Sequence, residues 1–248
     1  TNAGLTWRPV FDDKRIISMG MLAIAPSDTQ QVWAGTGEPN SRNTIVPGAG
    51  VYKSTDGGLT WTKLTTGLPA GDKGRIGLTL HAGDPRIVYA TIEARGAESG
   101  IYRTIDGGAR WEQTSRLNTR PNYYSQIRID PSNRDRVYTL GSNRGFYFSE
   151  DGGKTFSAPF TVHDDRQLIT HRFESILFDR QGALHVLWVD KRDAELARAR
   201  SGGKRDVYDG AAIYGKVSRD GAKTFGPDLK LSDYSCECCR IALVETPG

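Results

Sequence analysis

Three arginines in this chain stand at or just before short apolar runs. They are Arg75 in Gly-Arg-Ile, Arg172 in His-Arg-Phe and Arg240 in Cys-Arg-Ile. Guanidinium groups that converge on one point can bind a carboxylate through paired hydrogen bonds. We therefore expect these three arginines to bind an acidic ligand if the runs that follow them line a common channel. The alternative, which the sequence favours, is that each arginine pairs with a carboxylate of the next structural unit.

Two carboxylates begin long polar loops. Glu38 follows the apolar run 31–35, and Asp190 follows the run 184–188 with Arg192 close behind. Long loops on a rigid scaffold often carry binding or catalytic residues. Asp190 and Glu38 are thus the candidates for acid–base catalysis, and Arg192 for ligand binding. The plainer role, a surface loop position or an arginine partner, is the preferred one for both carboxylates.

The three cysteines of the chain, Cys236, Cys238 and Cys239, lie in one segment of four residues. Three thiolates can bind a soft metal ion, but no fourth ligand is evident. A structural disulfide is the preferred interpretation, and we expect no metal and no cofactor.

The elements that would position these residues are marked by a repeated phrase, in which Asp-Gly-Gly or Asp-Gly-Ala is followed by an aromatic residue. Copies occupy residues 54–61, 104–111, 149–156 and 218–225, and residues 2–7 match the end of another. Glycine supplies the positive φ of a tight turn, and aspartate accepts hydrogen bonds from the turn's own amides. Each copy therefore predicts a hairpin corner. The turn aspartates are structural, not catalytic: Asp56, Asp106, Asp151 and Asp220.

Apolar runs of strand length precede each phrase. Successive turn aspartates lie 50, 45 and 69 residues apart, which suits four short strands per unit and so a blade of a β-propeller. The longest spacing predicts an extended loop or a junction. No segment shows a helical period, so we expect a nearly all-β chain in which residues 198–205 form a solvated loop. The expected strands are 21–25, 31–35, 50–53, 76–80, 87–90, 100–103, 126–130, 136–140, 145–148, 175–178, 184–188 and 212–215.

These units predict a single propeller domain over residues 1–248 with about five blade units. This domain can be part of a larger propeller. Their bounds are roughly 1–15, 16–68, 69–117, 118–165 and 166–234, with the start of another at 235–248. The chain begins inside a repeat and finishes on a strand-like run, 241–245. Either the two ends complete one blade, or the chain is a piece of a longer protein, which is the preferred interpretation.

The phrase S-x-D-x-G-x-T-W/F resembles the Asp box, or BNR repeat, of the sialidase-like and sortilin-like propeller superfamily. Residues 1–156 resemble sortilin-type (VPS10-type) bacterial glycosyl hydrolase propellers, on phrases such as Val32-Trp33-Ala34-Gly35. From about residue 170 the chain is more similar to bacterial exo-sialidase propellers, on Trp188-Val189-Asp190-Lys191-Arg192 and on 235–240. The resemblance implies a bacterial protein that is exported to the periplasm, the cell surface or the medium. It also implies an arginine triad for a sugar carboxylate.

The resemblance does not supply a complete catalytic set. A retaining sialidase needs a tyrosine nucleophile paired with a glutamate, and no glutamate pairs with Tyr123, Tyr124 or Tyr208 in the sequence. The Arg-Ile-Pro phrase that is usual near the start of sialidases is also absent from this sequence.

The composition excludes two classes of partner. The net charge of +4 is distributed along the chain and not gathered in blocks, so we expect no nucleic acid. No apolar run is long enough to span a membrane. The preferred function is an exported binding or scaffold module that takes a protein, peptide or glycan on its channel face. The alternatives are an exo-acting glycoside hydrolase of sialidase type and a subunit or assembly factor of a larger complex.

Overall fold

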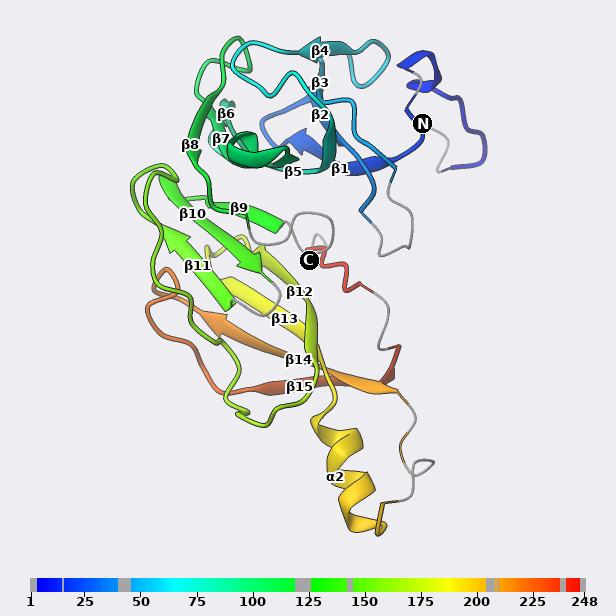
Figure 1. Ribbon diagram of the computed structural model, residues 1–248, viewed down its shortest axis with the longest axis vertical. Helices are drawn as coiled ribbons and strands as arrows, with labels where there is room; N and C mark the ends of the chain where they lie inside the picture. The colour runs from blue at the N-terminus through cyan, green and yellow to red at the C-terminus, as the bar shows by residue number, and fades with distance from the viewer. Residues whose placement is uncertain are drawn as a thin grey trace.

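The computed structural model describes residues 4–14, 16–39, 46–118, 126–141, 145–203, 208, 210–236 and 240–245. Four antiparallel sheets follow one another along these residues (Figure 1). The all-β propeller architecture predicted from the repeats is thereby confirmed. No helix among the described residues is long and apolar enough to cross a membrane.

Each sheet is a meander in which consecutive strands pair. The strand order is β1-β2-β3-β4, β5-β6-β7-β8, β9-β10-β11 and β12-β13-β14-β15. The first sheet comprises β1 Met19–Ala25, β2 Asp28–Thr36, β3 Val51–Ser54 and β4 Thr62–Leu64. The second comprises β5 Lys73–His81, β6 Asp84–Ala94, β7 Gly100–Thr104 and β8 Glu112–Ser115. The third comprises β9 Gln126–Asp130, β10 Asn133–Gly141 and β11 Gly145–Ser149, and the fourth β12 His171–Phe178, β13 Leu184–Asp190, β14 Ala211–Ser218 and β15 Leu229–Ser235.

The expected strands coincide with these elements, apart from Gly50, which precedes β3, and the strand-like run 241–245, which forms no strand. In the third sheet the described segment after the repeat forms no named strand, but it contacts β11 through a bridge between Phe146 and Phe160 and a hydrogen bond from the Ser157 amide to the Phe148 carbonyl oxygen at 2.9 Å. Two short 3-10 helices are also present: η1 Asp12–Lys14 precedes β1, and η2 Gly96–Glu98 lies between β6 and β7.

One expectation about local structure was wrong. Residues Arg192–Arg200 form a helix, α2, which projects from the end of the fourth sheet (Figure 1). The sequence predicted a loop over residues 198–205, but 198–200 are the last turn of this helix. The helix has no buried residue, so it shows no apolar stripe in the sequence. Acidic residues in its first turn and arginines in its last turn complement the helix dipole.

The first strands of successive sheets lie next to one another and form the inner wall of the array: β1 contacts β5, β5 contacts β9, and β9 contacts β12. Hydrogen bonds tie this wall together, such as the bond from the Ile129 amide to Thr79 Oγ1 at 3.4 Å. Farther out, aromatic side chains fill the space between sheets. The buried rings of Trp33 in β2 and of Trp111, which directly precedes β8, meet edge to face at 6.1 Å.

Each repeated phrase begins at the end of the third strand of its sheet and forms the turn that follows. In the first, Asp56 Oδ1 accepts hydrogen bonds from the amides of Leu59 and Thr60, both at 2.9 Å, and Oδ2 accepts one from the Thr60 hydroxyl. Asp151 has the same contacts with Lys154 and Thr155. The carboxylates are thus occupied within their own turns, on the face opposite the long loops.

Candidate ligand site between the third and fourth sheets

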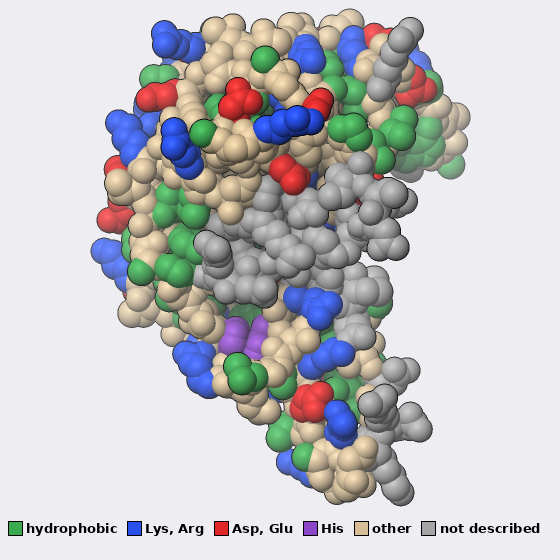
Figure 2. All heavy atoms as spheres, viewed as in Figure 1, with side chains coloured by type: hydrophobic (Ala, Val, Ile, Leu, Met, Phe, Trp, Pro, Cys, Tyr) green, Lys and Arg blue, Asp and Glu red, His purple; other side chains and the backbone are tan. Residues whose placement is uncertain are grey.

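A cavity of about 360 Å³ opens where the third and fourth sheets meet, at the end that carries the long loops. Its walls come from the ends of β10 and β13, the starts of β11 and β12, and the segment 159–169. Aromatic side chains line it, together with two histidines and one glutamate: Phe146, Phe160, His163, His171, Glu174 and Trp188. Figure 2 shows histidine side chains gathered in a hollow on this side of the molecule.

A β-bulge places Glu174 in this wall. The register of β12 against β13 shifts between Arg172, which pairs with Val189, and Ser175, which pairs with Leu187. Two residues of β12 therefore oppose the single residue Trp188, and bulges of this kind re-aim a side chain. Gln126 of β9 supports the bulge: its Nε2 donates to the Glu174 carbonyl oxygen at 2.7 Å, and its Oε1 accepts from the Ile176 amide at 3.4 Å.

The carboxylate of Glu174 has an unusual environment. Its Oε2 is buried and has no hydrogen-bond partner among the described residues. Burial raises the pKa of Glu174 from 4.5 to about 7, because the charged form loses its hydration. At neutral pH this side chain can therefore hold a proton or give one up.

Two histidines stack beside the cavity. The rings of His163 and His171 lie 3.8 Å apart and nearly parallel. His171 Nε2 is 3.1 Å from Asp165 Oδ2, and His163 Nδ1 is 2.6 Å from the backbone oxygen of Asp165. Burial and the neighbouring His171 lower the pKa of His163, so its neutral form is favoured.

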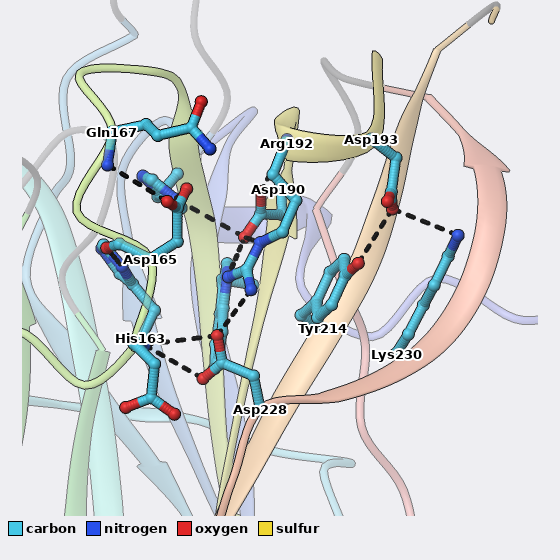
Figure 3. Close-up of polar contacts among 12 residues, drawn as sticks. His163, Asp165, Gln167, Asp190, Arg192, Asp193, Tyr214, Asp228 and Lys230 are labelled. Atoms are coloured by element: carbon cyan, nitrogen blue, oxygen red, sulfur yellow. Dashed lines mark hydrogen bonds and ion pairs between the residues drawn. The ribbon is translucent and has the colours of Figure 1, made fainter. Parts of the chain in front are cut away.

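Asp190 and Arg192 form the centre of a charged network at the end of β13 (Figure 3). Asp190 is fully buried, and its Oδ2 accepts hydrogen bonds from Arg192 Nε at 2.9 Å and from Trp188 Nε1 at 2.8 Å. The Arg192 guanidinium also reaches Asp228 at 2.7 Å and lies over the Tyr214 ring. These hydrogen bonds hold the pKa of Asp190 low although burial opposes this. The geometry makes Asp190 an anchor for Arg192 and a hydrogen-bond partner for Trp188 in the cavity wall.

Asp165, His171 and Asp190 each offer one atom to a metal ion, and the three atoms lie within 4.8 Å of one another. Asp190 Oδ2 is already engaged by Arg192 and Trp188, so a cation there would lie against a guanidinium group. The local charge therefore opposes a metal ion at this place.

The predicted arginines are brought together only in part. Arg75 is buried in β5, and its pKa is lowered to about 10 by burial and then by the nearby charges of Arg240 and Arg128. Arg240 also donates to the Pro39 carbonyl oxygen. Arg172 is exposed in β12 and is not among the charges that chiefly affect Arg75. The cluster on the inner wall thus consists of Arg75, Arg240 and Arg128, and Arg192 belongs to the separate network.

Other predicted residues lie apart from the cavity or outside the described residues. Glu38 is buried, and its Oε2 accepts from Ser18 Oγ at 3.4 Å. Tyr208 stacks on Tyr234 at 4.7 Å and donates to Asp233. Cys236 is exposed. The remaining candidates lie outside the described residues: Tyr123, Tyr124, Cys238 and Cys239.

Comparison with known proteins assigns the chain to a family. The family model Sortilin-Vps10, described as sortilin, neurotensin receptor 3, matches residues 99–240, more than half of the chain. The chain belongs to the Sortilin-Vps10 family. A BNR/Asp-box repeat model also matches residues 52–63, which include the first repeated phrase.

Curated relatives of this Sortilin-Vps10 chain include an enzyme and a sorting protein. It is 35% identical over 91 residues to a probable oligoxyloglucan-reducing end-specific xyloglucanase of Neosartorya fischeri, a match that covers 37% of this chain and 10% of that protein. It is 28% identical over 91 residues to vacuolar protein sorting/targeting protein 10 of Aspergillus clavatus, covering 34% of this chain and 6% of that protein. The chain therefore spans about a tenth or less of the length of these two relatives.

A solved structure agrees with the fold of the Sortilin-Vps10 chain. The GH74 enzyme of Niastella koreensis superposes with a TM-score of 0.55 at 17% identity, over 84% of this chain and 30% of that chain. At this identity the likeness bears on the fold alone.

Sequence reasoning missed two residues of the sites described above. Glu174 immediately precedes the apolar run 175–178. Its charge beside this run is the signal in the sequence that could have indicated a functional residue. Arg128 occupies a polar position in the regular alternation of β9, and its guanidinium donates to the backbone oxygens of Ile176 and Ile127 at 3.1 and 2.9 Å. Both positions lie in the first strand of a sheet, and these two strands, β12 and β9, pack against each other.

Proposed function

We propose that this chain is a glycan-binding part of an exported Asp-box propeller, and that the glycan occupies the cavity between the third and fourth sheets. One observation carries the proposal: the cavity combines aromatic faces with convergent polar groups on the face that holds the long loops. A volume of about 360 Å³ lies within the range of small-ligand sites, roughly 300–1,000 Å³. Trp188 and Phe160 offer apolar faces to a sugar ring, and His163, His171 and Glu174 offer polar atoms to its hydroxyl groups.

The relatives support a glycan over a peptide. A curated relative is named as a xyloglucanase, which acts on a glucan, and its match covers 37% of this chain. The relative named as a sorting protein supports the alternative of a protein or peptide ligand. Export is part of the proposal because the resemblance to sialidase-type propellers implies it.

A substitution that places a large side chain at the opening of the cavity tests whether the glycan binds there. Thr161 is exposed and lines the cavity, so Thr161→Trp blocks the opening without removing a buried contact. Calorimetric titration with xyloglucan, cello- and chito-oligosaccharides and with sialyllactose should give binding to at least one glycan, and a loss of affinity of about tenfold or more in the variant. Thr65→Trp, at an exposed position of the first unit, is the matched control and should bind as the wild type does.

No binding to any glycan by the folded protein would reject the proposal, and so would equal affinities in the two tryptophan variants. Capture of a peptide by the wild type, lost in Thr161→Trp, would instead favour a peptide-binding module.

A second candidate function, glycoside hydrolysis, is favoured by Glu174. A carboxyl group with a pKa of about 7 can donate a proton to a leaving group at neutral pH. The same glycans, offered as fluorogenic glycosides, should then be turned over by the wild type and not by Glu174→Gln. Absence of turnover alongside binding would leave the protein as a binding module.

A further inference from the structure

Glu174 also indicates which kind of glycan the cavity accepts, provided that the proposed function holds. Among the described residues that line the cavity, Glu174 is the only carboxylate, and its Oε2 is buried without a hydrogen-bond partner. A buried polar atom that lacks a partner costs stability, and the cost is larger when the group is charged. Such an atom therefore calls for a partner, which a bound group can supply.

The surroundings of Glu174 select a cationic partner. No charged side chain is a leading cause of its pKa shift, which comes from loss of hydration. The other titratable side chains among the described residues that line the cavity are His163 and His171, and the pKa of His163 is lowered, which favours its neutral form. A neutral ligand could donate a hydrogen bond to Oε2, whereas a positive charge would also favour the ionised carboxylate that burial disfavours.

The aromatic walls suit the same ligand. Trp188 lies opposite the bulge that carries Glu174, and its indole is 6.0 Å from the His163 ring. Phe146 and Phe160 close the other side, with their rings 5.2 Å apart. Aromatic faces attract an ammonium group through the ring quadrupole, and the attraction grows when water is excluded. A sugar ring with an amino group can therefore stack on these faces and place its nitrogen at the carboxylate.

We propose that the cavity binds a saccharide with a free amino group, and that Glu174 pairs with its ammonium nitrogen. The proposal rests on the proposed function of glycan binding in this cavity. It assigns the amino group, and not the ring hydroxyls, as the feature that the site selects.

Three trisaccharides with the same β-1,4 linkage provide the test because they differ only at carbon 2 of each ring. These are the glucosamine trisaccharide, its N-acetylated counterpart and cellotriose, each titrated calorimetrically at pH 7. The wild type should bind the amine about tenfold or more tightly than either neutral sugar. Glu174→Gln keeps the side-chain shape and removes the charge, so it should reduce this preference to less than about twofold while neutral sugars still bind.

The controls separate the two proposals. Glu112→Gln, at an exposed position of β8, loses one negative charge elsewhere and should keep the preference. Neutral sugars that bind as tightly as the amine, or a preference that persists in folded Glu174→Gln, would overturn the inference and leave the glycan-binding function intact. If none of the three binds and the panel above also fails, both proposals fall.

Discussion

At the scale of single residues, the hydroxyl group at the start of each repeated phrase supports the turn as much as the aspartate does. Ser149 is almost fully buried, and its Oγ accepts hydrogen bonds from the amides of Gly153 at 2.9 Å and Asp151 at 3.3 Å. The same hydroxyl donates to Asp151 Oδ1 at 2.8 Å. Ser54, Thr104 and Ser218 repeat this arrangement in the other turns.

We predict that Ser149→Ala lowers the free energy of unfolding by about 1–3 kcal/mol, because the buried Gly153 amide loses its acceptor. Denaturant unfolding of the wild type and the variant measures the difference. Ser27→Ala, at an exposed turn position, is the control and should change stability by less than about 0.5 kcal/mol. A similarly small change for Ser149→Ala would mean that the turn is held by its aspartate alone.

At the scale of elements, the end of β13 is joined to α2 and β14 through ion pairs. Arg192 of α2 contacts Asp190 at 2.6 Å and Asp228 at 2.7 Å, and Lys216 of β14 contacts Asp164 at 2.6 Å. The acidic partners come from segments far apart in sequence, so the network connects the segment before β12 with the loop before β15. Because Trp188 donates to Asp190, the network also fixes one wall of the cavity.

We predict that Asp190→Ala destabilises the protein by about 3 kcal/mol, since it leaves Arg192 with Asp228 as its remaining partner and the Trp188 indole N–H unpaired. Thermal and denaturant unfolding measure this loss. Glu195→Gln is the matched control because its contact with Arg198 is 3.8 Å long and half exposed, and such pairs contribute less than about 1 kcal/mol. If Asp190→Ala were as stable as Glu195→Gln, Asp190 would not be an anchor.

The strands and the helix show which parts of the structure could be predicted from the sequence. The strands were predictable because alternating apolar residues and the glycine-rich turns of 54–61 and 104–111 act locally. The position of Glu174 in the cavity wall could not be predicted, because it depends on a bulge that is set by the pairing of β12 with β13. Helix α2 was missed because it buries no residue and so has no apolar period. The sequence raised a convergence of Arg75 and Arg240 but favoured a carboxylate partner for each, and Arg128 lies mid-strand and joins them through the packing of β9 against β5.

At the scale of the whole molecule, buried and exposed carboxyl groups give stability opposite dependences on pH. Hydrogen bonds lower the pKa of Asp151 and Asp220 to about 2, so their stabilisation is present above pH 4 and is lost as the pH falls toward 2. Burial raises the pKa of Glu174 to about 7, so the stability that this group contributes is present at low pH and is lost as the pH rises. Burial lowers the pKa of His163, so a protonated His163 destabilises the folded protein. The stability therefore increases as the pH rises toward 6.5, the ordinary pKa of histidine.

We predict that stability conferred by protonated Glu174 is fully present below pH 4.5 and is lost as the pH rises to about 7. The folded protein binds the proton more tightly than the unfolded chain does, and a shift of this size corresponds to about 3 kcal/mol at most. Glu174→Gln isolates this contribution, because His163, His171 and every aspartate remain in both proteins. The unfolding free energy of the wild type minus that of the variant should fall by up to about 3 kcal/mol between pH 5 and pH 8. A difference that does not change with pH would mean that water reaches Glu174, and the cavity would then offer no buried charge for a ligand to neutralise.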